Sequence, residues 1–152
     1  MLVNNAGVLG KMQSLEELDL EDCLATFRVN ALGAIAVTRA LLPQLRKSKV
    51  RKVLHVSTGM ASIADNSSGG AYGYRMSKAA LNMASKCLAV GLRGDRIVSA
   101  VINPGWVQTD MGGSGAPTSV VDSAKGILQQ IDALDVEHTG QFLDYKGGTL
   151  DW

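Results

Sequence analysis

The alternation of short apolar runs with long helix-forming segments is the feature that most constrains how this 152-residue chain can fold. The apolar runs are residues 1–7, 51–57, 96–103 and 140–145. The segments with apolar residues at helical spacing are residues 22–46, 72–93 and 119–134. Strands that alternate with such helices pair in parallel, because each helix carries the chain back to the same edge of the sheet. We therefore expect one α/β domain over residues 1–152, with about four parallel strands and helices on both faces.

Charge and hydropathy argue against several classes of partner. The net charge is +1, so there is no overall basic field to attract nucleic acid or anionic lipid. The longest apolar stretch, residues 31–45, is interrupted by Arg39 and Pro43 and is too short to span a bilayer. No charged segment followed by an apolar one opens the chain, so we expect a cytoplasmic protein with no membrane contact. The two cysteines lack zinc-ligand spacing, and no metal site is expected.

Tyr74 and Lys78 are the first candidates for chemistry. Their i, i+4 spacing at the start of a predicted helix places a phenol and an ammonium group on the same face. A nearby cation stabilises the phenolate and lowers its pKa from about 10, so such a tyrosine can donate a proton near neutral pH. The alternative is an ordinary helix on which Lys78, Asn82 and Lys86 form a solvated stripe. The spacing alone does not separate the two interpretations, because it is common by chance.

Three further positions change that balance. Ser57 and Thr58 directly follow a strand, where ligands of open α/β sheets bind, although such a pair is more often a turn or a helix cap. Asn30 lies inside a long predicted helix, where asparagine is mildly unfavourable, so it is either a surface residue or part of a buried polar relay. The segment 104–109 ends another strand with a stiff Pro-Gly turn. Each signal is weak alone, but together they indicate one site at the strand ends.

With these residues the chain resembles the short-chain dehydrogenase/reductase family. The resemblance rests on NNAG at residues 4–7, on Asn30 in VNA, on VLHVST at 53–58, on YRMSK at 74–78 and on NPGWVQTDMGG at 103–113. It covers essentially the whole chain. The stretch 68–90 and the terminal GQFLDYKGGTLDW are most similar to the subgroup of C-factor and Sniffer-like carbonyl reductases. The resemblance implies a Rossmann-like three-layer sandwich and an oxidoreductase that uses NAD(P) to interconvert small carbonyl compounds and alcohols.

The resemblance also implies a role for each matching residue. Tyr74 would donate the proton, Lys78 would lower its pKa and bind the nicotinamide ribose, and Asn30 would anchor a proton-relay water. The residues implied to shape the cofactor cleft or cover the nicotinamide are Asn5, Ala6, Gly7, Pro104, Gly105, Val107 and Thr109. The hydroxyl that orients the carbonyl falls on Thr58 by position, with Ser57 as the neighbouring candidate. Of the two nicotinamide cofactors, NADP is slightly favoured.

One expected part of such a protein has no counterpart in the sequence. The family begins with a strand, a glycine-rich TGxxxGxG turn and a helix whose N-terminus holds the pyrophosphate. We therefore expect an N-terminally truncated chain that keeps the catalytic half, lacks the first βαβ unit, and binds NAD(P) weakly or not at all. A second hypothesis is a catalytically inactive half-domain that acts through protein contacts. Its predicted contact surface is a homo-oligomer interface formed by helices 22–46 and 72–93, as the resemblance implies.

Overall fold

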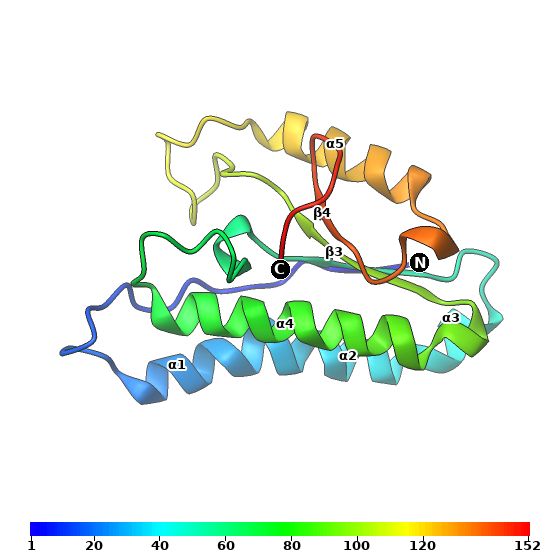
Figure 1. Ribbon diagram of the computed structural model, residues 1–152, viewed down its shortest axis with the longest axis horizontal. Coiled ribbons are helices and arrows are strands. Elements are labelled where there is room, and N and C mark those ends of the chain that lie inside the picture. Colours follow the sequence, from blue (N-terminus) through cyan, green and yellow to red (C-terminus); the bar gives the residue numbers. More distant parts are fainter.

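The computed structural model describes residues 1–152 and contains one parallel sheet with the strand order β1-β2-β3-β4 (Figure 1). The strands are β1 (Leu2–Asn4), β2 (Lys52–Val56), β3 (Val98–Asn103) and β4 (Phe142–Asp144). In the register of the central pair, Leu54 lies beside Ala100 and Val56 beside Ile102. The predicted α/β fold is confirmed, with all four strands within the runs identified from the sequence.

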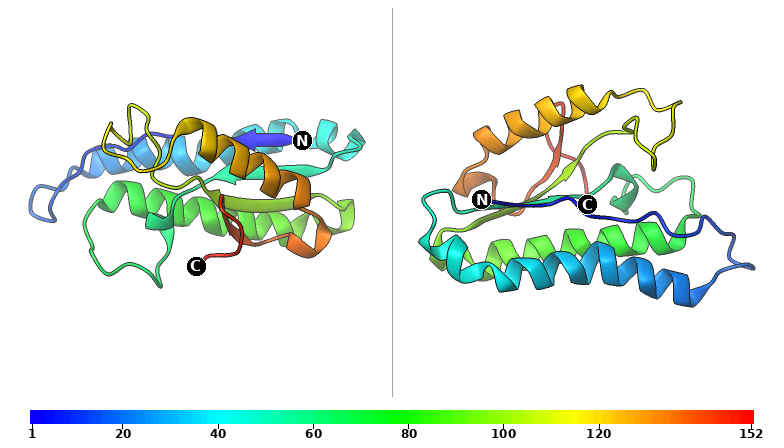
Figure 2. Two further views of the ribbon diagram at one scale, coloured as in Figure 1. Left: turned by 90° about the horizontal axis from the view of Figure 1, so that it is seen from above. Right: turned by 180° about the vertical axis from the view of Figure 1, so that it is seen from behind.

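Helices cover both faces of this sheet, as Figure 2 shows from two sides. One face carries α4 (Tyr72–Gly91) beside a long helical segment made of α1 (Leu20–Phe27), η1 (Arg28–Gly33), α2 (Ala34–Ala40) and α3 (Leu42–Lys47). The other face carries α5 (Val120–Ala133), whose N-cap Ser119 accepts a hydrogen bond from the Asp122 amide. Short 3₁₀ turns lie at η2 (Gly59–Ala61), η3 (Arg93–Asp95) and η4 (Val136–His138). No helix is both long and apolar enough to cross a membrane.

The long helical segment differs from the single helix predicted over residues 22–46. It contains one stretch of π-helix, η1, and a break at Leu41, where ψ is 2°. The break follows from Pro43 at the start of α3, because proline has no amide hydrogen and its ring would clash with the carbonyl group of residue 39 in a continuous helix. The helix is therefore interrupted before α3.

Apolar side chains of the sheet alternate between two cores. Leu54, Ala100 and Ile102 pack against α5 through Ile131, together with Leu143 of β4. On the opposite face, Val53, Ile97 and Leu45 form a smaller cluster. That cluster is smaller because polar side chains occupy much of the same face. His55, Ser57 and Ser99 are all buried there between the strands and the helices.

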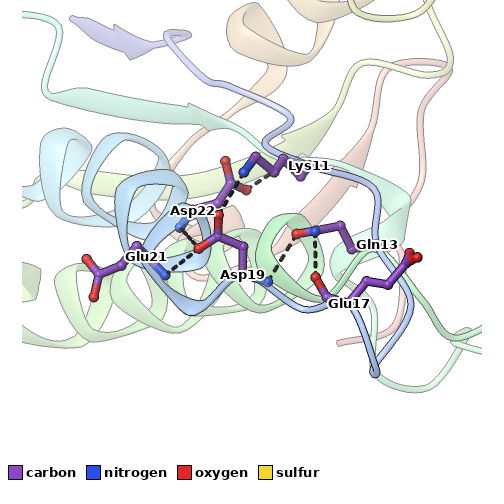
Figure 3. Close-up of polar contacts among 6 residues, drawn as sticks. All are labelled: Lys11, Gln13, Glu17, Asp19, Glu21 and Asp22. Carbon is purple, nitrogen blue, oxygen red and sulfur yellow. Dashed lines mark hydrogen bonds and ion pairs between the residues drawn. The ribbon is translucent and has the colours of Figure 1, made fainter.

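The connection from β1 to α1 is held by polar contacts (Figure 3). Lys11 Nζ lies 2.7 Å from Asp19 Oδ2, and the Lys11 amide donates to Asp22 Oδ2 at 2.8 Å. Asp19 also caps α1 by accepting from the amides of Glu21 and Asp22. Gly10 is required in this connection, because its φ is +67° and a Cβ there would lie 2.4 Å from Thr26 Oγ1. These contacts fix the path of the chain directly after the segment that borders the site.

Candidate active site

A cleft of about 1020 Å³ opens where the carboxyl ends of the strands meet α4 and α5. Of the site residues predicted from the sequence, all but Asn30 line this cleft. The lining residues among them are Asn5, Ala6, Gly7, Ser57, Thr58, Tyr74, Lys78, Pro104, Gly105, Val107 and Thr109. Because the strands are parallel, segments that follow β1, β2 and β3 converge on one edge of the sheet, the position at which open α/β sheets bind ligands.

Tyr74 lies in the first turn of α4 and is 8% exposed. Burial raises the pKa of its phenol above the ordinary value of 10, and the nearby Thr58 side chain acts in the opposite direction. Thr58 itself ends the loop after β2 and caps η2 by accepting from the Met60 amide at 3.3 Å. The phenol and the Thr58 hydroxyl therefore face each other at the edge of the cleft.

Lys78 follows one helical turn later and is almost fully buried, so it does not belong to a solvated stripe. Its ammonium group donates to the Val56 carbonyl oxygen at 2.8 Å, and burial lowers its pKa to about 8. Gly7 leaves room for the ammonium group, since a Cβ on Gly7 would lie only 3.3 Å from Lys78 Nζ. The net pKa shift of Tyr74 is upward, opposite to the expectation, because burial outweighs the other effects and Lys78 is not among the groups that shift it.

Asn30 lies in the π-helical turn η1 and is fully buried. Its Oδ1 accepts from the Val8 amide at 2.8 Å, while its Nδ2 donates to the Val8 carbonyl oxygen at 2.8 Å and to Ser77 Oγ at 2.9 Å. The side chain thus joins the segment after Gly7 to η1 and α4. A π-helical turn is rare and often occurs at functional sites, where it redirects one side chain. Of the two interpretations, the structure favours the buried polar residue over the surface one.

Ser57 and Thr58 have different surroundings although both border the cleft. Ser57 is 3% exposed, and its hydroxyl donates to Asn82 Oδ1 on α4 at 2.6 Å. Thr58 is less buried and interacts with the Tyr74 phenol. The hydrogen of the Ser57 hydroxyl therefore points into the protein, and Thr58 supplies the hydroxyl on the tyrosine side.

Two residues that hold the site together were not predicted. Asn103 Oδ1 accepts from the Gly59 amide at 3.1 Å and the Gly105 amide at 3.3 Å, and its Nδ2 donates to Asp144 Oδ2 at 2.8 Å. Arg75, next to Tyr74, donates to the Met60 carbonyl oxygen at 3.0 Å. Asn103 has a signal in the sequence, since it is the last residue of a strand before Pro-Gly. Arg75 has none, because its partners are set only by the fold.

The segment after β3 forms a wall over the cleft. Trp106 Nε1 donates to the Gly112 carbonyl oxygen at 2.8 Å, and the Gly112 amide donates to Thr109 Oγ1 at 3.1 Å. The Ser123 hydroxyl on α5 donates to the Pro104 carbonyl oxygen at 2.7 Å and fixes the start of the segment. Apart from Lys78, Asp110 is the one charged residue of the lining, so most of the cleft surface is neutral.

A parallel sheet with helices on both faces, and a cleft with tyrosine and lysine at its strand ends, place the chain among the Rossmann-like α/β proteins. Residues 1–119 match the family model described as short chain dehydrogenase, and the chain belongs to that family. The resemblance inferred from the sequence is thereby confirmed.

Individual relatives agree with this assignment. The chain is 49% identical to C-signal of Myxococcus xanthus over 152 residues, which cover 100% of this chain and 92% of that protein. It matches the structure of the carbonyl reductase Sniffer of D. melanogaster with a TM-score of 0.95 and 36% identity, over 99% of this chain and 66% of that one. An NADPH-bound carbonyl reductase from chicken fatty liver matches with a TM-score of 0.92 and 31% identity, over 99% and 64%. The chain thus spans about two thirds of the length of these two solved reductases.

Proposed function

We propose that this chain carries the catalytic half of an NAD(P)-dependent carbonyl reductase, which interconverts small carbonyl compounds and alcohols. The observation that carries the proposal is the meeting of the Tyr74 phenol, the Thr58 hydroxyl and the Lys78 ammonium group in one cleft at the strand ends. NADPH is the favoured cofactor, in line with the NADPH-bound reductase from chicken fatty liver. The bound nicotinamide supplies the hydride.

The residues present fit the nicotinamide side of such a cofactor. Gly7 leaves space beside Lys78, whose ammonium group has three hydrogens and gives one to Val56. The other two would be available to a ribose hydroxyl of the bound cofactor. Asn5, Ala6, Pro104, Val107 and Thr109 would border the nicotinamide on the β1 and β3 sides.

In the proposed reaction, the Thr58 hydroxyl donates a hydrogen bond to the substrate carbonyl oxygen and so orients it beside Tyr74. The raised pKa keeps the phenol protonated at neutral pH, ready to give its proton to the developing alkoxide. Lys78 is largely cationic below its pKa of about 8 and would hold the ribose of the bound cofactor on the side of the cleft where Tyr74 lies. Asn30 binds the backbone of Val8 and the Ser77 hydroxyl of α4, and so fixes the segment after Gly7 relative to α4.

The direct test is turnover of this chain with NADPH or NADH and a series of aldehydes and ketones, followed by the absorbance of the reduced nicotinamide. For a polypeptide of residues 1–152 assayed alone, we expect turnover with NADPH and weak cofactor binding, because these residues contain no TGxxxGxG turn to hold the pyrophosphate. Three fewer charge-assisted hydrogen bonds at roughly 1.5–3 kcal/mol each would move a micromolar dissociation constant into the millimolar range. Absence of both turnover and calorimetric binding at millimolar concentrations of either cofactor would refute the proposal.

A second candidate function is action through protein contacts, and one surface favours it. On α4, Met76, Met83 and Val90 recur every seven residues and are all exposed, with Cys87 between the last two. Leu24 and Leu32, on the neighbouring α1–η1 segment, are also exposed. The two helices pack side by side, and exposed apolar side chains on adjacent helices are typical of a protein–protein interface. C-signal, which this chain covers over 92% of its length, is named for signalling rather than for a reaction.

We propose that this helical face pairs with a second copy of the chain. The variant Met83→Glu is expected to raise the dimer dissociation constant at least about tenfold in analytical ultracentrifugation, because it places a carboxylate in the apolar contact. Ile63→Glu is the matched control, since Ile63 is 78% exposed but lies in the loop after β2. A monomeric wild-type chain at high concentration, or an equal effect of both variants, would contradict this interface.

A further inference from the structure

A second, smaller pocket opens at the end of the sheet where β3 and β4 begin. Its volume is about 210 Å³, and it is lined by Arg93, Arg96, Ile97, Val98, Val136, Glu137 and Thr139. The active-site cleft lies at the opposite end, where the parallel strands finish. The six residues of β3 separate the two ends by roughly 20 Å. The small pocket is therefore separate from the cleft that would hold the nicotinamide.

Two arginines that line this pocket have no acidic partner. Arg93 lies in η3, Arg96 is the C-cap of η3, and both are exposed. The cations of the three salt bridges in the structure are Lys11, Arg46 and His138. Arg93 and Arg96 take part in none of them. Because a guanidinium group has five N–H donors and no acceptor, both groups remain available to an anion that enters the pocket.

The neighbouring part of the chain adds further positive charge. Residues 46–52, which lead from α3 into β2, contain five lysines and arginines and no acidic residue. The Val98 amide donates to the Arg51 carbonyl oxygen at 2.8 Å, so this basic segment lies beside the start of β3. Asp95 is the one acidic residue of η3, and it is already paired with Arg46 at 2.9 Å. The net charge of +1 thus coexists with a basic region at this end of the sheet.

The backbone of Arg96 is in a conformation that favours glycine. Its φ is 55° and its ψ is 33°, which lie in the left-handed region. The Arg96 amide donates to the Arg93 carbonyl oxygen at 3.0 Å, and the Ile97 amide donates to the Leu92 carbonyl oxygen at 3.3 Å. This pair of hydrogen bonds is the usual way to end a helix at a glycine. A residue with a Cβ is strained at that position, so the turn itself does not explain an arginine there.

We propose that this pocket binds the phosphate group of a small phosphorylated compound through Arg93 and Arg96. Guanidinium groups match the oxygen atoms of a phosphate in both geometry and charge. The pocket is smaller than the roughly 300–1,000 Å³ of sites for larger organic ligands, so it suits a phosphate with few further atoms. Glu137 is the one carboxylate of the lining and opposes a more highly charged anion, which favours a single phosphate over a polyphosphate. This site does not depend on the proposed reductase activity.

A free phosphomonoester and the headgroup of a phospholipid both present this chemistry, and two measurements separate them. The first is a titration of the chain with glycerol 3-phosphate at constant ionic strength, followed through the amide resonances. We expect saturable shifts in residues 93–97 and 136–139 and none at Gly7 or Thr58 in the cleft. The second is co-sedimentation with phosphatidylcholine vesicles that contain or lack phosphatidic acid. Binding to phosphatidic acid alone would identify a lipid as the source of the phosphate, and binding in neither measurement would overturn the proposal.

Arg96→Gly is the most informative variant, because it removes the guanidinium group and also relaxes the turn. We expect phosphate binding to weaken at least about tenfold, the loss of one charge-assisted hydrogen bond, while the melting temperature stays the same or rises. Weaker binding then cannot be explained by unfolding. Arg93→Gln should weaken binding to a similar extent. Unchanged binding in both variants would refute the assignment of these two arginines.

Lys49→Gln is the matched control for the pocket. It removes one positive charge from an exposed residue of the basic segment, but Lys49 does not line the pocket. We expect phosphate binding to change by less than about twofold, because the effect of an exposed charge outside the pocket is screened. Glu137→Gln should instead strengthen binding, because it removes the opposing carboxylate. Equal weakening by Lys49→Gln and Arg93→Gln would show a diffuse attraction of anions and would contradict a defined site.

Discussion

Replacing Tyr74 with phenylalanine is expected to lower carbonyl-reductase turnover by about 10²–10⁴-fold, the contribution of a well-placed general acid. The substitution removes one oxygen atom and keeps the ring that packs at the start of α4, where the side chain is 8% exposed. The proton for the developing alkoxide would then have to come from solvent. The loss should appear in kcat, because the phenol acts on charge that develops only in the transition state.

Tyr72 provides the matched control for this variant. It lies on the same helical turn as Tyr74 but does not line the cleft. Tyr72→Phe should therefore leave turnover within about twofold, while calorimetric binding of NADPH stays unchanged in both variants. If Tyr74→Phe retains wild-type turnover, the proton comes from another group, and the assignment of Tyr74 is wrong. If both variants keep the ability of the chain to pair with a second copy, action through protein contacts does not depend on the phenol, and the second candidate function gains support.

The arrangement of the strands could be predicted because it depends on local pattern. Apolar runs of strand length between amphipathic helices leave few alternatives to a parallel sheet. The strand ends then bring Gly7, Thr58 and Pro104 to one edge whatever the details of the helices. The break before α3 is also encoded locally by Pro43, which interrupts the continuous helix expected over residues 22–46.

Burial and partner choice could not be predicted in the same way. Lys78, Asn82 and Lys86 share one spacing, yet Lys78 and Asn82 are buried and Lys86 is exposed. Spacing places them on one side of the helix, but the position of the sheet beneath the helix decides which of them lose contact with water. The π-helical turn at Asn30 is equally nonlocal, because the contacts of that side chain with Val8 and Ser77 exist only after the layers pack.

The pKa of Tyr74 illustrates the same limit. The i, i+4 pairing with Lys78 suggested a lowered pKa, whereas burial makes the net shift upward. A charge at fixed sequence spacing acts through its actual distance and through the solvent between the groups, and neither is given by the spacing. In the structure, Lys78 directs its ammonium group to the Val56 carbonyl oxygen. With the ammonium group directed there, its charge is not among the causes that shift the pKa of the phenol.

The buried charge of Lys78, which the proposed reaction needs, is expected to lower the stability of the protein more than any other site residue does. Its pKa falls from 10.5 to about 8 because burial disfavours the charged form. A lowering of this size corresponds to about 3 kcal/mol of unfavourable free energy when the lysine is charged. Since the folded pKa lies below the unfolded one, the unfolded chain holds the proton more tightly. The contribution of Lys78 to stability is therefore most favourable above pH 10.5, declines as the pH falls toward 8, and carries the full cost at pH 7.

The variant Lys78→Met is accordingly expected to be more stable than the wild type at pH 7 while losing about 10²-fold or more in turnover. Methionine fills a similar volume without a charge, and the lost hydrogen bond to Val56 offsets about 1 kcal/mol of the gain. A net gain of about 2 kcal/mol should raise the melting temperature by roughly 4–8 °C in calorimetry. The advantage should shrink as the pH rises from 8 to 10.5, because the wild-type lysine then becomes neutral in the folded state.

Lys86→Met is the control that isolates the buried charge. Lys86 lies two turns further along α4, is exposed, and donates to the Gly140 carbonyl oxygen at 3.0 Å. Because its charge remains in contact with water, its replacement should give no gain in stability and no change in pH dependence between 8 and 10.5. If Lys78→Met is less stable than the wild type at pH 7, or if its advantage does not depend on pH, then burial of the ammonium group carries no such cost. A stable but inactive Lys78→Met would instead show that the charge at this position serves the reaction, since the protein is more stable without it.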